Sequence, residues 1–233
     1  MPPAQARPVD APRSARDTMA FHRVVNLSDA VFAIALTLLV LTLDVPIADL
    51  HRLGDALRDQ LPQFIAFGLS FALVANLWWQ HHRLFDLLEA IEPAAIGINL
   101  ILLAFVALVP YPTSLLGVAP ANTTAVIVFL AVFVVLTLLH LALLARAGSQ
   151  GLVRADLPRE RYVGLLAGYA VGTLVLLVSM LIALWSATVA LVVVGLSIVL
   201  GPLGARRPDR ILRHYAPTSS PPVKAPPPKR PPR

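Results

Sequence analysis

The chain has 233 residues, of which 57% are hydrophobic and only 14% are charged, and it contains no cysteine. This composition excludes an ordinary water-soluble domain and is typical of a protein that crosses a membrane several times. The lack of cysteine excludes disulfides and thiolate metal sites. The net charge of +6 does not indicate nucleic-acid binding, because the basic residues lie beside the apolar stretches rather than in a separate domain.

Six apolar stretches predict six transmembrane helices, each long enough to cross a bilayer core of about 30 Å at a rise of about 1.5 Å per residue. The predicted spans are residues 27–45, 61–81, 94–116, 123–144, 162–184 and 185–203. Pro110 and Pro112 are expected to break the third span near its end. The sequence therefore predicts an all-α, polytopic membrane protein.

The polar segments divide the chain into a cytoplasmic N-terminal segment (1–22), a transmembrane domain (23–203) and a basic, proline-rich cytoplasmic tail (204–233). With six spans, only Arg52 and Arg58 of the 19 Lys and Arg lie on the side opposite the termini. The positive-inside rule then predicts a multi-pass inner-membrane protein with both termini in the cytoplasm. The tail is interpreted either as a docking segment or lipid tether, or as a solvated extension.

The first span carries polar residues at its start, with Ser28 and Asp29 inside it and Arg23 just before it. An aspartate costs roughly 2.5–3.5 kcal/mol at the centre of a membrane and less towards its edge. Such a cost usually marks an ion path or a buried polar network. The first span is therefore the candidate functional element.

At about 100° per residue, one face of this helix forms a stripe of residues with a border position at Thr37. The stripe consists of Leu27, Ala30, Ile34, Leu38, Leu41 and Val45. One hypothesis is that it packs against copies of itself around an axis. The other is a lipid-facing or core helix, whose polar start supplies only capping groups.

Polar residues of the first three spans are brought together at the cytoplasmic side by the predicted topology. They are Arg23, Ser28, Asp29, Trp79, His81, His82 and Asn99. A buried network is expected, because unpaired polar groups in that layer are costly, with Asp29 paired to Arg23 or to a histidine. The network is interpreted either as a lock between helices or as a gate or proton-sensitive switch, since histidine titrates near neutral pH.

No signature of an enzyme is present: the sequence has neither a Gly-x-Ser-x-Gly turn nor a phosphate-cradling glycine-rich loop. A metal site is not expected, because the adjacent His81 and His82 point in different directions on a helix. The sequence predicts no enzyme activity and no cofactor.

The segment from Arg23 to Leu41 reads Arg-xxx-Leu-Ser-Asp followed by Ala-Val-Phe-Ala-Ile-Ala-Leu-Thr-Leu-Leu-Val-Leu. It resembles the Arg-xxx-Phe-Ser-Asp signature of the endolysosomal potassium channels and their bacterial relatives. These relatives are six-helix proteins without a P-loop filter. Residues 79–85, 99–103 and 110–113 are also similar, so the resemblance covers about residues 23–115. Leu27 stands where the family usually has phenylalanine.

The resemblance implies a potassium-permeable channel in which the first helices of a homotetramer line a central pore through the bilayer. It places the narrowest ring at Ile34, the next two rings at Leu38 and Leu41, and a pore-side threonine at Thr37. The Ser-Asp stretch occurs once in the chain, so a pore requires several copies of the protein. Two alternatives stay open: a proton-coupled secondary transporter that uses Asp29 and the histidines as a relay, and a non-conducting membrane scaffold.

Overall fold

The computed structural model describes residues 15–44, 53–154 and 157–205. The chain divides into two units, Met1–Ile198 and Val199–Arg233, which are considered separately. The described residues are helical apart from turns, loops and one isolated β-bridge, which confirms the all-α fold. The helices are α1 (Ala15–Leu38), the 3-10 helix η1 (Leu39–Thr42), α2 (Leu53–Asp59), α3 (Leu61–Asp86), α4 (Pro93–Leu108), α5 (Pro110–Val118), α6 (Thr123–Ser149), α7 (Arg159–Ala183) and α8 (Ala187–Ala205).

Within the described residues, five helical segments are long and apolar enough to cross a membrane, and they correspond to the first five predicted spans. The first helix begins at Ala15 rather than at Leu27, because hydropathy marks only the apolar part of a helix that continues through polar residues. The apolar part of α8, Ala187–Leu200, is shorter than the other five, so the sixth span stays a prediction. Residues 1–14, Val45 and residues 206–233, which include most of the predicted tail, lie outside the described residues.

The third predicted span is divided into α4 and α5 as the prolines suggested. Pro110 is the first residue of α5, directly after Val109, and a proline inside a helix removes a backbone N–H and clashes with the preceding turn. The interruption is supported by side chains: the hydroxyl groups of Thr113 and Ser70 lie 2.7 Å apart, and that of Thr113 also lies 2.9 Å from the carbonyl oxygen of Val109. The break is thereby attached to α3.

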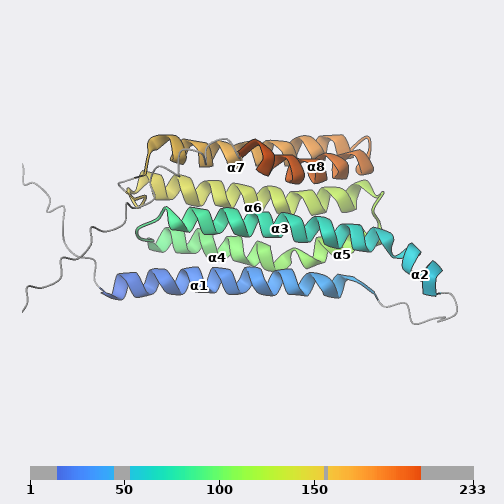
Figure 1. Cartoon of the computed structure of the whole chain (residues 1–233), viewed down its shortest axis with the longest axis horizontal. Helices are drawn as coiled ribbons and strands as arrows, with labels where there is room; N and C mark the ends of the chain where they lie inside the picture. Colours follow the sequence, from blue (N-terminus) through green and yellow to red (C-terminus); the bar gives the residue numbers. More distant parts are fainter. Residues whose placement is uncertain (1–14, 45–52, 155–156, 206–233) are drawn as a thin grey trace, which may run out of the picture. The chain divides into compact units, whose positions relative to one another are not determined.

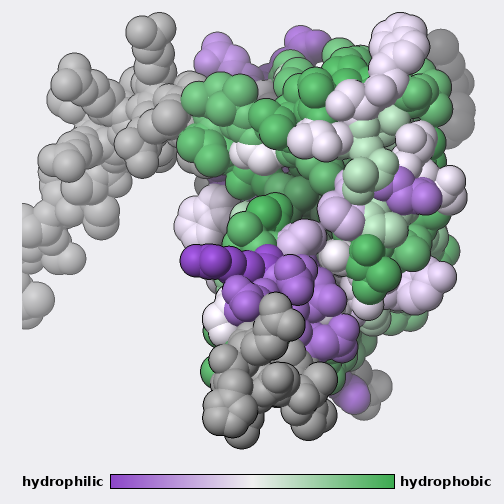
Figure 2. All heavy atoms as spheres, turned by 90° about the vertical axis from the view of Figure 1, so that its right-hand side faces the viewer, coloured by the Kyte–Doolittle hydropathy of each residue, from purple (hydrophilic) through white to green (hydrophobic). Residues whose placement is uncertain are grey.

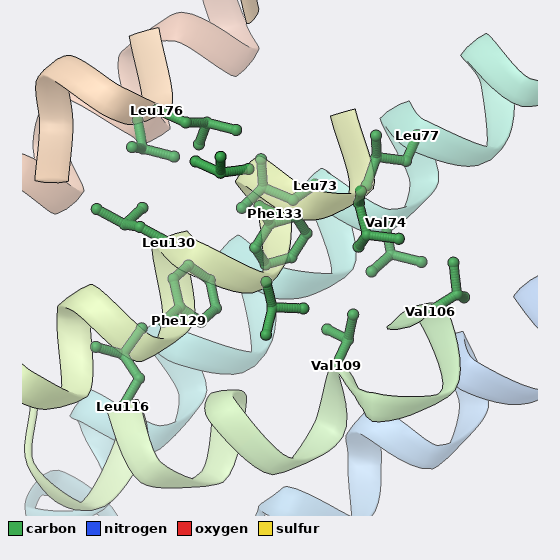
Figure 3. Close-up of a cluster of buried hydrophobic side chains, with 14 of the residues drawn as sticks. Leu73, Val74, Leu77, Val106, Val109, Leu116, Phe129, Leu130, Phe133 and Leu176 are labelled. Atoms are coloured by element: carbon green, nitrogen blue, oxygen red, sulfur yellow. The ribbon is translucent and has the colours of Figure 1, made fainter. Parts of the chain in front are cut away.

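The core of the first unit forms where α3, α4, α5 and α6 meet, and the helices run alongside one another (Figure 1). α1 packs against α3 and α4, α4 packs against α6, and α6 packs against α7. Figure 3 shows side chains from α3 to α7 pointing into one apolar cluster, with Phe129 and Phe133 of α6 near its centre. Both phenylalanines are fully buried, so α6 is the central helix and α1 is peripheral.

Two connections at one end of the bundle pair with each other, as expected for segments on the same side of a membrane. Leu88 and Val153 form an antiparallel β-bridge, with the Glu89 N–H bonded to the Leu152 carbonyl at 2.9 Å. Glu92, directly before α4, and Arg146, in the last turn of α6, add an ion pair beside these connections. The second and fourth connections therefore share one side, as the sequence predicted.

Hydrophilic side chains gather at the opposite end, beside α2 (Figure 2). The exposed charged residues of this end are Asp44, Asp55, Arg58 and Asp59. The start of α3 is tied to the end of the first helical segment there, since Gln60 donates a side-chain hydrogen bond to the Asp44 carbonyl at 2.6 Å. Both ends of the bundle thus carry polar groups, while the surface between them is largely apolar.

Two glycines at the C-terminal end of α6 have different structural roles. Gly151 has a φ of 64°, a left-handed conformation that ends a helix at little cost only for glycine. Gly148 makes room for Tyr162 of α7, whose hydroxyl donates to the Leu144 carbonyl at 3.2 Å. A Cβ atom at position 148 would lie 2.6 Å from Cζ of that tyrosine.

We expect Gly148→Ala to destabilise the protein by about 1–3 kcal/mol, the usual cost of inserting a methyl group into a packed contact. Thermal unfolding of the purified protein in detergent measures the loss. Gly168→Ala in α7 is the matched control, because a Cβ atom there meets no atom within 4 Å and alanine is the better helix former. Equal melting temperatures for the two variants would contradict the role assigned to Tyr162.

Candidate functional site

The stripe predicted on the first span is exposed in the protomer. The exposed fraction of the side chain is 46% at Leu27, 56% at Ile34, 41% at Leu38 and 74% at Leu41. Ala30 is also exposed, whereas Val45 lies outside the described residues. This apolar face is available for contact with lipid or with other copies of the chain.

The opposite face of α1 is buried against α3 and α4, and that of η1 against α3 and α5. Phe32 and Leu39 are completely buried, and Ala35 is 2% exposed. Because α1 turns by about 100° per residue, these residues and the exposed stripe alternate along the same three turns. The first helix therefore has one side bound to the protomer and one side free of it.

Thr37 introduces an exposed hydroxyl group beside the stripe. Its side chain is exposed, and its hydroxyl donates to the carbonyl of Ile34 at 2.8 Å. Donation to the helix backbone leaves the oxygen lone pairs directed away from the helix. An exposed oxygen thus lies one turn beyond Ile34, the position predicted to be narrowest.

Part of the predicted polar network is present and buried. Asn99 of α4 donates from Nδ2 to the Ser28 hydroxyl at 3.0 Å, and this hydroxyl donates to the Val24 carbonyl at 2.9 Å. The side chains of Ser28 and Asn99 are 1% and 0% exposed. Their bond joins α1 to α4 at the depth where the sequence predicted a network.

Asp29 has a different partner from the one predicted. The sequence suggested an ion pair with Arg23 or a histidine, whereas the structure places the indole Nε1–H of Trp78 at 3.0 Å from its carboxylate. Trp78 stacks on His82, with ring centroids 5.9 Å apart, and His82 lies 3.6 Å from Asp86. The aspartate is thereby attached to α3 through an aromatic side chain.

The other predicted members of the polar network differ in how deeply they are buried. Trp79 is 54% exposed and Arg23 is exposed, so neither lies in the buried part of the network. His81 is 2% exposed and packs against Phe32 of α1, with ring centroids 5.3 Å apart. Adjacent residues on a helix point in directions about 100° apart. Hydropathy therefore could not show which of the neighbouring tryptophans, Trp78 or Trp79, faces Asp29.

Sequence reasoning missed His140 in α6. It is fully buried, its ring lies 5.3 Å from that of His81, and it stacks on Tyr169 of α7. A single histidine inside an otherwise apolar span was the signal that could have revealed it. Among the described residues, no group of three or more His, Asp or Glu side chains could hold a metal ion.

The long apolar helices and the buried polar contacts between them define a multi-pass α-helical membrane protein. Residues 23–110 match the family described as "Endosomal/lysosomal potassium channel TMEM175". A potassium channel of Streptomyces collinus is 37% identical over 147 residues, which cover 60% of this chain and 71% of that protein. The chain belongs to the TMEM175 potassium channel family, a family of ion channels and not of enzymes.

A solved structure agrees with this assignment. The potassium-selective TMEM175 homologue from Chamaesiphon minutus superposes with a TM-score of 0.72 and 28% sequence identity, covering 79% of this chain and 97% of that one. The TMEM175 of Danio rerio, named as a proton channel, is 28% identical over 125 residues, 53% of this chain and 24% of the zebrafish protein.

Proposed function

We propose that the chain forms a potassium-permeable channel in which the first helices of a homotetramer line a central pore. The observation that carries this proposal is the exposed stripe of α1, which lies on the helix that contains the family signature and faces away from the protomer core. One helix cannot enclose a pore, so several copies must surround an axis. The number four comes from the resemblance.

The proposed constriction is a ring of Ile34 side chains, followed by rings of Leu38 and Leu41, with Thr37 contributing hydroxyl oxygens. Rings of bulky apolar side chains close a pore by excluding water. K⁺ gives up its hydration shell at a lower cost than Na⁺, so a narrow apolar ring favours K⁺. Selectivity then depends on the width of the pore and the nearby oxygens, without a cofactor or a carbonyl filter.

The polar network is proposed to hold the pore helix in place. The Asn99–Ser28 and Trp78–Asp29 hydrogen bonds attach α1 to α4 and α3 on the side opposite the stripe. Arg23, Trp79 and His82 are exposed, so they are suited to a contact with lipid headgroups or with the cytoplasm.

The proposed location is the inner membrane, with both termini in the cytoplasm. The β-bridge between Leu88 and Val153 supports a common side for two connections, and the basic residues of those connections favour the cytoplasmic side.

Proton conduction is the second candidate, because the zebrafish relative is named as a proton channel. A proton does not need the same pore width as K⁺, and an apolar constriction that wets only transiently can pass either ion. The secondary-transporter and scaffold hypotheses are distinguished from both candidates by the flux measurement described next.

Flux into liposomes that contain only the purified protein distinguishes these functions. We expect a passive K⁺ flux driven by a K⁺ gradient, larger than the Na⁺ flux under a matched Na⁺ gradient. A pH-sensitive dye inside the vesicles reports protons in parallel. Flux that requires a proton gradient would favour the transporter, proton flux without K⁺ flux would favour the second candidate, and no flux from verified tetramers would favour the scaffold.

A further inference from the structure

Two histidines face each other inside the protomer, away from the exposed stripe of α1. His81 of α3 is 2% exposed and His140 of α6 is completely buried. Their rings meet edge to face, with centroids 5.3 Å apart. His140 also stacks on Tyr169 of α7 at 5.4 Å, and His81 contacts Phe32 of α1 at 5.3 Å.

The hydrogen bonds of His140 determine which of its nitrogens carries the proton in the neutral ring. Nδ1 lies 2.8 Å from the carbonyl oxygen of Leu136, and a carbonyl only accepts, so Nδ1 is the donor and Nε2 is an acceptor. Within the described residues, Nε2 of His140 has no hydrogen-bond partner, and neither nitrogen of His81 has one.

Two of these three unpartnered nitrogens are complementary. A neutral imidazole always carries one N–H, so His81 is a buried donor that lacks an acceptor, beside a buried acceptor that lacks a donor. Buried polar groups of this kind are nearly always paired in native proteins, either directly or through an ordered water. The facing rings supply the two partners.

We propose that the N–H of His81 donates to Nε2 of His140, directly or through one water, and that this bond is a proton-sensitive connection between the α1 side of the protomer and α6–α7. On one side His81 contacts Phe32 of the proposed pore helix, and on the other His140 is stacked on Tyr169, whose hydroxyl donates to the Gln80 carbonyl at 3.1 Å. The link to the pore rests on the proposed function, whereas the hydrogen bond and its proton sensitivity do not.

The surroundings of the pair explain why an added proton would destabilise the folded protein. The side chains against the rings are aromatic: Phe32 from α1, Phe85 from α3 and Tyr169 from α7. From α4, Nδ2 of Asn99 donates to Ser28, whereas its Oδ1 has no hydrogen-bond partner among the described residues. His82 acts electrostatically on His81, and Arg83 acts on Tyr169. The Asp86 carboxylate lies 3.6 Å from His82.

In the described residues no carboxylate contacts either ring of the pair. The neutral pair carries two N–H protons, one on each ring, and a third proton is therefore a buried charge without a counter-ion, which is unfavourable. The stabilisation from the neutral pair should be complete at pH values above the usual titration range of histidine and be lost as the pH falls through it.

Phenylalanine substitutions test the bond, because the pocket is already aromatic. We expect His81→Phe and His140→Phe each to lower the melting temperature of the full-length protein by several degrees, since each leaves one buried nitrogen unpaired. The double variant should lose less than the sum of the two single losses. Additive losses, or a single variant that melts higher than the wild type, would overturn the proposal.

The same proteins test the proton sensitivity. Between about pH 8 and about pH 5, the wild type should lose more degrees of melting temperature than the double variant, which keeps every other titratable group. Parallel losses in the two proteins would refute a proton-sensitive pair. This comparison needs no ion flux, so it can fail while the channel function holds.

Nitrogen-15 NMR of the wild type labelled at histidine provides a measurement that does not depend on folded variants. Two neutral buried imidazoles at about pH 8 are expected. A nitrogen–nitrogen coupling between them indicates a direct hydrogen bond, and hydrogen-bonded shifts without coupling indicate the bridging water. An imidazolium signal from either ring at this pH, or a shift typical of an unbonded nitrogen at the N–H of His81 or at Nε2 of His140, would overturn the proposal.

Discussion

Ile34→Asn is expected to raise the K⁺ conductance several-fold and to bring the K⁺/Na⁺ permeability ratio close to one. Ile34 is 56% exposed on the stripe that faces away from the protomer core, and an amide in each subunit would replace an apolar ring by a ring of hydrogen-bonding groups. Such a ring keeps water in the constriction, so both cations pass with more of their hydration shell. Planar-bilayer recordings and liposome flux measure the two changes.

The control is Leu181→Asn in α7. Leu181 is 64% exposed and lies on a helix that packs against α6 rather than α1. This variant places the same amide on the surface of the protomer outside the proposed pore. The cost of inserting the amide into the membrane is therefore similar in the two variants. Unchanged currents from Ile34→Asn tetramers, or equal changes in both variants, would place the constriction elsewhere.

Asp29→Ala is expected to lower the yield of folded protein far more than it alters selectivity. The carboxylate accepts a hydrogen bond from Trp78 Nε1 at 3.0 Å, and hydrogen bonds to charged groups contribute about 1.5–3 kcal/mol to stability. Alanine also leaves the indole N–H unpaired between α1 and α3. A drop of several degrees in the melting temperature is the expected result.

Asp29→Asn separates the charge from the hydrogen bond. Its side-chain oxygen can still accept from Trp78, so this variant should melt close to the wild type if the bond is what matters. Trp78→Phe should resemble Asp29→Ala, because it removes the donor. Normal assembly of Asp29→Ala with altered permeation would instead place this carboxylate in the conduction path.

The helices and their two faces were predictable from the sequence because they depend on local periodicity. The stripe from Leu27 to Leu41 follows from the turn angle of a helix, and the structure exposes it in the protomer. The division of the third span followed from Pro110, since a proline interrupts a helix whatever surrounds it. The bridge at Leu88 agrees with the side that charge counting assigned to two connections.

Partners in the buried network were harder to predict, because they depend on how helices rotate against each other. Ser28 and Asn99 were both predicted members, and their hydrogen bond is present. In contrast, the sequence pointed to Trp79, whereas the rotation of α3 directs Trp78 to Asp29 and leaves Trp79 exposed. One residue along a helix turns a side chain by about 100°, which hydropathy cannot resolve.

The sequence by itself determined the all-helical membrane class, the apolar stripe of the first helix and the family signature around Asp29, because composition and short-range spacing carry this information. Only the tertiary structure decided that Asp29 bonds to an indole and that His140 of α6 meets His81 of α3. These contacts join residues far apart in the chain, so they arise from the packing of whole helices against one another and leave no local pattern in the sequence.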